Sequence, residues 1–214
     1  MRYLKNENGV ALVTALLLTL ISLAMIMAVL YLVTQGIKVS AANKSYRSAL
    51  DASYGGGGEF FPKDVLPQLV KNFNDYSSPS TATTETLKLF PSWTNMQFSN
   101  SDCLSQKMNS PKLEWTSCGA GNKTLDPKSS PDATFTLRGE GLLPGFRVFT
   151  KIVDTIPGNS DPSGNTGLLS GAGVTGTSSG VSPKHLPATY RIEVQGERET
   201  NPQEKAALSV LYAY

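Results

Sequence analysis

Two cysteines and a single histidine are the residues of this chain whose types could support metal or nucleophilic chemistry. Cys103 and Cys118 form no Cys-x-x-Cys motif, and His185 is the only histidine. Structural zinc needs four cysteine or histidine ligands at short characteristic spacings, so the sequence does not favour a zinc site. His185 lies between Pro183 and Pro187, and nothing nearby marks a nucleophile for a Ser-His-Asp set. We therefore expect no enzyme activity, no catalytic residue, no metal site and no cofactor.

A glycine-rich segment contains two weak ligand-binding patterns. Residues 171–176 match Gly-x-Gly-x-x-Gly, but a dinucleotide site needs a strand before this pattern and a helix after it. The residues Thr-Ser-Ser-Gly-Val-Ser-Pro follow, and they open a helix poorly, so we interpret the match as chance. A calcium loop fails because Ser170 stands where a bidentate glutamate is needed. A looser calcium site with Asp154, Asp161 and backbone carbonyls stays open as a minor alternative.

The two cysteines have a simpler interpretation if the domain is exported. An even number of cysteines in an oxidising compartment favours a disulfide. Closing a loop of ~15 residues contributes ~3 kcal/mol in the chain-entropy account. We expect Cys103 and Cys118 to be joined around a loop that carries Trp115. Two free thiols or a metal pair are the alternatives.

The element that organises the chain is an apolar segment near its start. No charged residue occurs between Glu7 and Lys38, and ~20 apolar residues are enough to cross a bilayer as a helix. Small and apolar residues then recur at three- and four-residue spacing as far as Leu50, which is typical of one helix face. We expect one helix over 10–54, transmembrane over about 10–37. Four glycines, 55–58, are predicted to end it because glycine is unfavourable inside helices.

The residues in front of this helix form a short basic leader. They read MRYLKNENG, with Arg2 and Lys5, and the small-residue boundary Gly9-Val10 precedes the apolar run. A secretory signal peptide has a shorter apolar run with its cleavage site after it. The arrangement resembles the leader of type IV prepilins. The run GVALVTALLLTLISLAM looks most similar to PilX-type minor pilins, and next to the large minor pseudopilin of type II secretion, over about the first quarter of the chain.

The resemblance implies a maturation route and a set of partners. A prepilin peptidase would remove the leader 1–9 after Gly9, and Val10 would become the methylated N-terminus. Before assembly the chain would cross the inner membrane once, with Arg2 and Lys5 on the cytoplasmic side and the head in the periplasm. It would then enter a pilus at the cell surface and prime assembly at or near the tip. Implied partners are the other minor pilins and the major pilin through the N-terminal helix, the inner-membrane assembly platform and a PilY-type tip adhesin.

One position departs from the common pilin pattern. After cleavage the fifth residue is Thr14, where most pilins carry a glutamate that pairs with the N-terminal amine of a neighbouring subunit. A carboxylate in an apolar helix is tolerated only when it is paired. Thr14 either merely spares the helix a charge or marks a subunit with no neighbour above it. We favour the second interpretation, because tip subunits of the resembled family share the missing carboxylate.

The rest of the chain, 55–214, is large enough for one globular head domain. Net charge is only +2, which gives no electrostatic case for a nucleic-acid partner. Four segments rich in β-branched and aromatic residues predict strands at 133–139, 145–155, 188–196 and 205–214. A short helix is predicted from about Lys63, and 77–86 is interpreted as a polar connector. The expected fold class is α+β: a long N-terminal helix packed against a four-stranded antiparallel sheet, as in the pilins it resembles.

The segment 156–187 is a long connection dominated by Gly, Ser, Thr, Pro and Asn. So long a connection is unusual in a compact domain and indicates either a functional loop or a tolerated insertion. Two alternative functions also stay open. One is a minor pseudopilin of type II secretion, although its large tip member usually has an extra domain for which this chain has little room. The other is a bitopic membrane protein with a periplasmic binding domain and an uncut leader.

Overall fold

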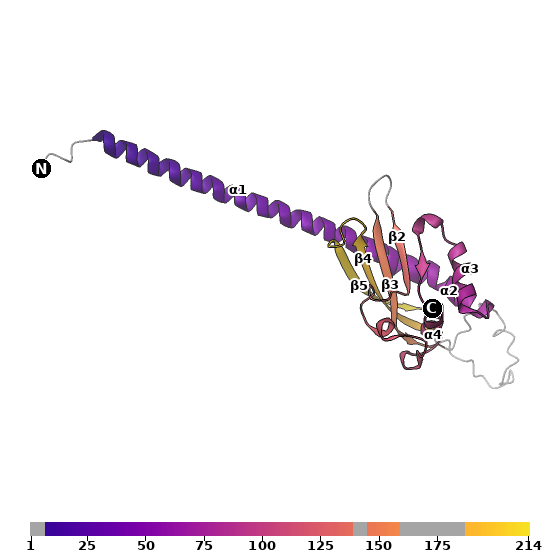
Figure 1. The fold of residues 1–214 in the computed structure, drawn as a ribbon. Coiled ribbons are helices and arrows are strands. Elements are labelled where there is room, and N and C mark those ends of the chain that lie inside the picture. Colours follow the sequence, from indigo (N-terminus) through magenta and orange to yellow (C-terminus); the bar gives the residue numbers. More distant parts are fainter. Residues whose placement is uncertain (1–6, 139–144, 159–186) are drawn as a thin grey trace, which may run out of the picture. The chain divides into compact units, whose positions relative to one another are not determined.

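The computed structural model describes residues 7–138, 145–158 and 187–214. The chain divides into two compact units, Met1–Ser45 and Tyr46–Tyr214, and the division falls within helix α1 (Glu7–Ser53). Figure 1 shows α1 and the labelled elements that follow it. Several features singled out in the sequence lie outside the described residues. They are Arg2 and Lys5 of the leader, Asp161, the glycine-rich 171–176, Ser170, His185 and most of the connection 156–187.

The first unit is the apolar part of α1. Its side chains are exposed in every direction around the helix, from Val10 at 66% to Val39 at 68%. The described residues contain one helix long and apolar enough to cross a membrane, and this segment belongs to it. Such a helix, apolar all round, requires an apolar environment rather than water.

The predicted helix end at 55–58 is wrong. The chain continues as a π-helical segment, η1 (Tyr54–Val65), and then as helix α2 (Leu66–Asp75). The N–H of Leu66 donates to the carbonyl oxygen of Phe61, five residues back, as in a π-helix. Gly56 and Gly57 are tolerated because the helix lies directly on the sheet there. A Cβ on Gly57 would stand 2.1 Å from Cγ1 of Val194, so only glycine allows this approach.

The second unit contains an antiparallel sheet of five strands in the order β1-β2-β3-β4-β5. The strands are β1 (Gln97–Phe98), β2 (Ala133–Leu137), β3 (Phe146–Ile156), β4 (Thr189–Arg198) and β5 (Lys205–Ala213). The last four correspond to the strands predicted, and the two-residue β1 is an addition at the edge. Each strand pairs with its neighbour in sequence, so the sheet is a meander.

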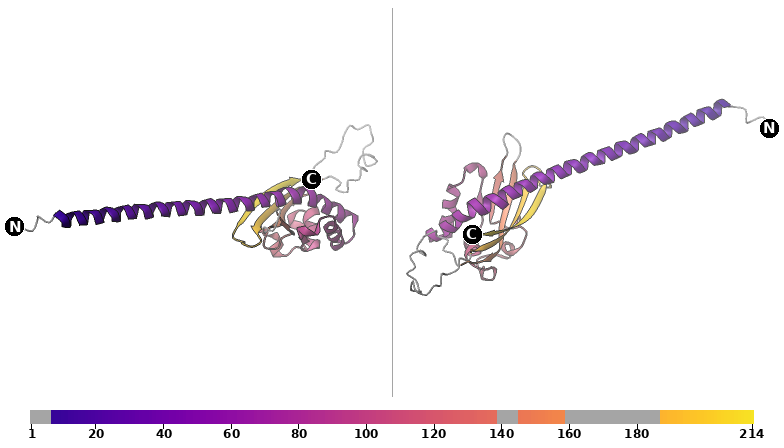
Figure 2. Two further views of the ribbon diagram at one scale, coloured as in Figure 1. Left: turned by 90° about the horizontal axis from the view of Figure 1, so that it is seen from above. Right: turned by 180° about the vertical axis from the view of Figure 1, so that it is seen from behind.

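The core of the head lies between the sheet and the continuous helix of η1 and α2, which Figure 2 shows along one face of the sheet. The helix contributes Phe61, Val65, Leu66, Leu69 and Val70 to it, and the sheet contributes Phe135, Val148, Ile152, Tyr190, Ile192 and Val194. The end of α1 belongs to the same packing: Ala49 is fully buried and Leu50 half-buried, while Tyr46 remains 49% exposed. The end of the long helix, expected from the sequence to pack against the sheet, is thus buried at Ala49 and partly buried at Leu50.

Two further segments differ from the sequence prediction. The polar connector 77–86 is mostly helix α3 (Pro79–Lys88), held to α2 by a hydrogen bond of 2.8 Å from Asn72 Nδ2 to Thr86 Oγ1. The loop between the cysteines begins as helix α4 (Ser101–Asn109) rather than as irregular chain. Short 3-10 turns complete the head at Ser92–Thr94 (η2), Lys112–Glu114 (η3) and Ala120–Lys123 (η4).

Candidate functional site

The residues predicted to be processed lie at the start of α1. A Cβ on Gly9 would meet no other atom within 4 Å, and the side chain of Val10 is 66% exposed. Both residues are therefore free of tertiary contacts among the described residues. The hydroxyl of Thr14 donates to the carbonyl oxygen of Ala11 at 2.9 Å, so this polar group is satisfied within its own helix. Thr14 can consequently sit in an apolar medium without a partner from another chain.

The head carries a second candidate site around the two cysteines. Cys103 on α4 and Cys118 after η3 form the predicted disulfide. Trp115 is fully buried beside the bridge, and its indole N–H donates to the carbonyl oxygen of Ser110 at 2.9 Å. The bridge thus closes a small lobe with its own apolar centre, separate from the main core.

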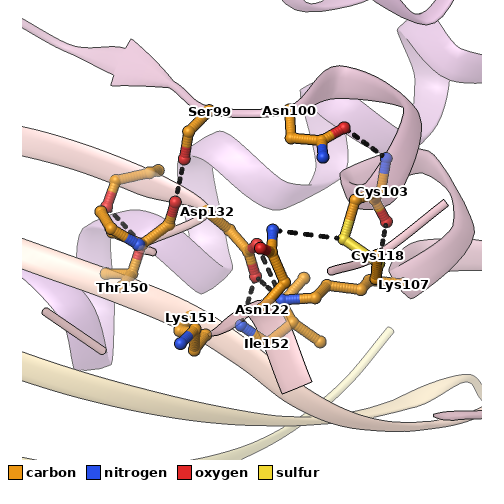
Figure 3. Close-up of polar contacts among 12 residues, drawn as sticks. Ser99, Asn100, Cys103, Lys107, Cys118, Asn122, Asp132, Thr150, Lys151 and Ile152 are labelled. Atoms are coloured by element: carbon orange, nitrogen blue, oxygen red, sulfur yellow. Dashed lines mark hydrogen bonds and ion pairs between the residues drawn. A yellow bond between two sulfur atoms is a disulfide. The ribbon is translucent and has the colours of Figure 1, made fainter. Parts of the chain in front are cut away.

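A buried ion pair joins this lobe to the sheet. Nζ of Lys107 lies 2.8 Å from both carboxylate oxygens of Asp132, and the two side chains are 0% and 1% exposed. Asp132 also accepts the backbone N–H of Ile152 on β3 at 2.7 Å (Figure 3). The Lys107 ammonium lies 5.4 Å from the centroid of the Trp115 ring. Burial lowers the pKa of Lys107 and raises that of Asp132, because desolvation disfavours both charged forms, while their mutual attraction opposes this.

A second buried lysine organises the loop that follows the disulfide. Nζ of Lys151 on β3 donates to three backbone carbonyls, those of Gly121 (2.8 Å), Asp126 (2.8 Å) and Ser129 (2.9 Å). It also donates to Oγ1 of Thr124 at 3.1 Å. Burial lowers the pKa of Lys151, and the nearby charge of Lys107 lowers it further. One ammonium group therefore holds the whole turn 121–129 around itself, much as a bound cation would.

The lobe, the turn and the sheet edge together form a cleft of about 330 Å³. Its lining comes from β1 and the residue after it, from the residue before α4, from η4, from the segment leading into β2, and from β2 itself. The side chains that face the cleft include Gln97, Phe98, Asn100, Asn122, Ser130 and Thr134. Figure 3 shows Ser99, Asn100 and Asn122 around the disulfide and the ion pair. Lys151 holds the turn that contains the lining residue Asn122, and Asp132, the partner of Lys107, follows the lining residues Ser130 and Pro131 in sequence.

The looser calcium site with Asp154 and Asp161 is not tested by the described residues. Asp154 on β3 is exposed and its carboxylate accepts the N–H of Thr155, while Asp161 lies outside the described residues. Within 7–138, 145–158 and 187–214, no three His, Cys, Asp or Glu side chains gather as metal ligands would. Sequence reasoning missed the cleft and both buried lysines. Lysines are mostly exposed in proteins, and nothing in the local pattern of Lys107 or Lys151 indicates burial.

Comparison with known proteins supplies no relative: no family description, curated protein or solved structure matches this chain.

Proposed function

We propose that this protein is a minor subunit of a type IV pilus, resembling the PilX-type, which primes assembly and occupies the filament at or near its tip. The observation that supports this proposal best is α1 (Glu7–Ser53). Its first part bears apolar side chains that no other described part of the chain covers. Its last turns are buried against an antiparallel sheet, where Ser53 Oγ donates to the carbonyl oxygen of Ala206 at 3.1 Å.

This combination suits a subunit that is first held in a membrane and then withdrawn into a helix-packed filament. A bilayer and a bundle of apolar helices are similar environments, so the same exposed surface can be accommodated in both. An antiparallel sheet anchored on the end of the helix gives the subunit a head outside that apolar region. The short leader before Gly9 adds the processing signal expected of a prepilin.

The proposed sequence of events uses no catalysis by this chain. A prepilin peptidase cuts after Gly9, Val10 becomes the new N-terminus and is methylated, and the helix then packs against other pilins. Thr14 places no carboxylate at the fifth mature position, so the subunit can enter the bundle without an amine from a subunit above it. The head is then free to help display a PilY-type adhesin.

The decisive experiment is the intact mass of the membrane-extracted chain after co-expression with a prepilin peptidase. Wild type should lose its first nine residues and gain one methyl group. Gly9→Arg should stay full length. Asn6→Arg, which adds the same charge within the leader and leaves Gly9 in place, should still be cut.

A wild-type chain that keeps Met1 in the presence of active peptidase would contradict the proposal and favour the bitopic membrane protein. A cleaved chain that copurifies with secretion pseudopilins rather than with pilus subunits would place it in a type II secretion system instead.

A further inference from the structure

The cleft between the disulfide lobe and the edge of the sheet is lined by side chains that carry no charge. The lining offers the amides of Gln97, Asn100 and Asn122, the hydroxyls of Ser130 and Thr134, and the ring of Phe98. A volume of about 330 Å³ is at the lower end of the range of small-ligand sites, about 300–1,000 Å³. It is large enough for one or two sugar-sized rings.

Much of the hydrogen-bonding capacity of this lining is unused. Within the described residues, the side chains of Gln97, Ser130 and Thr134 form no hydrogen bond to protein. Asn100 uses only its Oδ1, which accepts the N–H of Cys103 at 3.1 Å, so its amide N–H groups remain available. Asn122 uses only Nδ2, which points to Sγ of Cys103 at 3.5 Å, so its oxygen remains available. The cleft therefore presents free donors and free acceptors side by side.

This set of groups selects a class of ligand. A charged ligand would find no opposite charge in the lining, and an apolar one would leave the amides and hydroxyls without partners, which is unfavourable. A neutral ligand rich in hydroxyls can both donate to and accept from these groups. The Phe98 ring offers such a ligand an apolar face. We propose that the cleft binds a neutral saccharide.

The structure behind the cleft holds these groups in place. The four acceptors of the Lys151 ammonium fix the turn 121–129, which sets the positions of Asn122 and Ser130. The Lys107–Asp132 pair ties α4 to the residue before β2, and Asp132 in turn accepts the N–H of Ile152 on β3. The disulfide ties α4 to the chain before η4. Buried ion pairs of this kind contribute little net stability compared with apolar packing. Buried polar contacts that fix the segments lining the cleft are what a preorganised binding site requires.

The backbone supports the same assignment. Among the described residues other than glycine, three have positive φ, and two of these, Asn100 (φ 50°) and Ser130 (φ 80°), line the cleft. Such conformations are unfavourable and persist only where surrounding contacts enforce them, often around ligand sites. This assignment does not depend on the proposed role in pilus assembly.

The test uses the full chain, solubilised in a zwitterionic detergent without a sugar headgroup, on an array of mono- to tetrasaccharides. The array carries neutral hexoses, deoxyhexoses and N-acetylhexosamines beside sialylated and sulfated glycans. We expect retention of at least one neutral glycan and no preference for charged ones. The affinity for the bound glycan is then measured by titration with the free saccharide.

Two variants remove single unused groups without disturbing the packing. Gln97→Ala and Thr134→Val should each weaken saccharide binding about fivefold, the loss expected for one hydrogen bond of ordinary strength. Gln203→Ala in the β4–β5 turn and Thr189→Val at the start of β4 are matched controls outside the cleft, and both should bind like wild type. Absence of binding to every neutral glycan, preference for charged glycans, or unchanged affinity in both cleft variants would overturn the proposal.

Discussion

The backbone of Gly57 in η1 lies against the side chain of Val194 on β4. A Cβ on Gly57 would stand 2.1 Å from Cγ1 and 2.5 Å from Cγ2 of this valine, whereas a Cβ on Gly55 would meet nothing within 4 Å. Val194 is itself fully buried in the main core. Two glycines of one run therefore have different roles: one permits the contact between helix and sheet, and the other is needed for no contact that the structure describes.

This difference predicts opposite effects of the same substitution. Gly57→Ala should destabilise the head by about 1–3 kcal/mol, because the methyl group must displace Val194 or the helix. Gly55→Ala should instead stabilise it by up to about 1 kcal/mol through helix propensity. Urea denaturation of both variants measures the two values. Equal effects of the two substitutions would show that the close contact has no energetic importance.

The buried ion pair predicts a large loss when one partner is removed. Lys107→Met should cost about 3–5 kcal/mol, because the Asp132 carboxylate is left buried without its counter-charge. Lys88→Met, which removes a lysine paired with Glu85 on the surface, should cost less than about 1 kcal/mol. The double variant Lys107→Met with Asp132→Leu should recover only part of the loss, because Asp132 also accepts the N–H of Ile152. Losses of equal size for Lys107 and Lys88 would contradict the assignment.

The buried Tyr190 predicts that the free energy of unfolding decreases at alkaline pH. Its hydroxyl donates to the carbonyl oxygen of Met108 at 3.0 Å, and burial raises its pKa to about 12. Since the folded pKa lies above the ordinary value of about 10, its contribution to stability is fully present below pH about 10 and is lost as the pH rises through about 12. Tyr190→Phe should cost about 1–3 kcal/mol at neutral pH by leaving the Met108 carbonyl unpaired.

Between pH about 10 and pH about 12 the unfolding free energy of wild type should therefore fall more steeply than that of Tyr190→Phe. Denaturant titrations at closely spaced pH values would show the two curves converging. Parallel curves would mean that this phenol does not contribute to alkaline unfolding.

The proposed role in a pilus makes Thr14 a test of where the chain would sit in the filament. Thr14→Glu should still be cleaved, but it should prime assembly less well, because at a tip the new carboxylate would lack a neighbouring amine. Thr14→Val, which is similar in shape and uncharged, should prime like wild type. Immunogold labelling of a head-tagged wild type should mark filament ends. Label spread along the shaft, with Thr14→Glu as active as wild type, would remove the argument for a tip position.

The strands were predictable because their residues alternate in character. In the predicted strand 188–196, Tyr190, Ile192 and Val194 alternate with Arg191, Glu193 and Gln195 in sequence, and the first three are all buried in β4. The two-residue β1 was not predictable, since a strand so short has no period to recognise. Helix α3 was missed for a related reason: it buries Ala82, Thr83 and Thr86, which resemble a polar connector in sequence. The buried Thr86 hydroxyl is satisfied by two hydrogen bonds: it accepts from Asn72 Nδ2 and donates to the carbonyl oxygen of Ala82.

The continuation of the helix through the glycine run and the presence of the cleft could not be predicted from the sequence, for another reason. Helix propensity correctly describes the free-energy cost of placing the glycines 55–58 in an isolated helix. It does not take into account the sheet against which Gly57 packs. Likewise Lys107 and Lys151 become distinctive only when segments distant in sequence enclose them. The disulfide could be predicted from the sequence because cysteine pairing depends mainly on the number of cysteines and on the redox state of the compartment.

The hydrogen bond between Ser53 and Ala206 also has a consequence for the order of folding. It joins residues separated by 153 positions, whereas neighbouring strands of the meander are also neighbours in sequence. Closing a long loop is entropically more expensive than closing a hairpin. We therefore expect the sheet to grow strand by strand from local contacts and to receive the end of α1 late. Until that step the carbonyl oxygen of Ala206 on β5 would lack its bond from Ser53, and Gly196 on β4 would not yet be covered by Ala49 and Ser53.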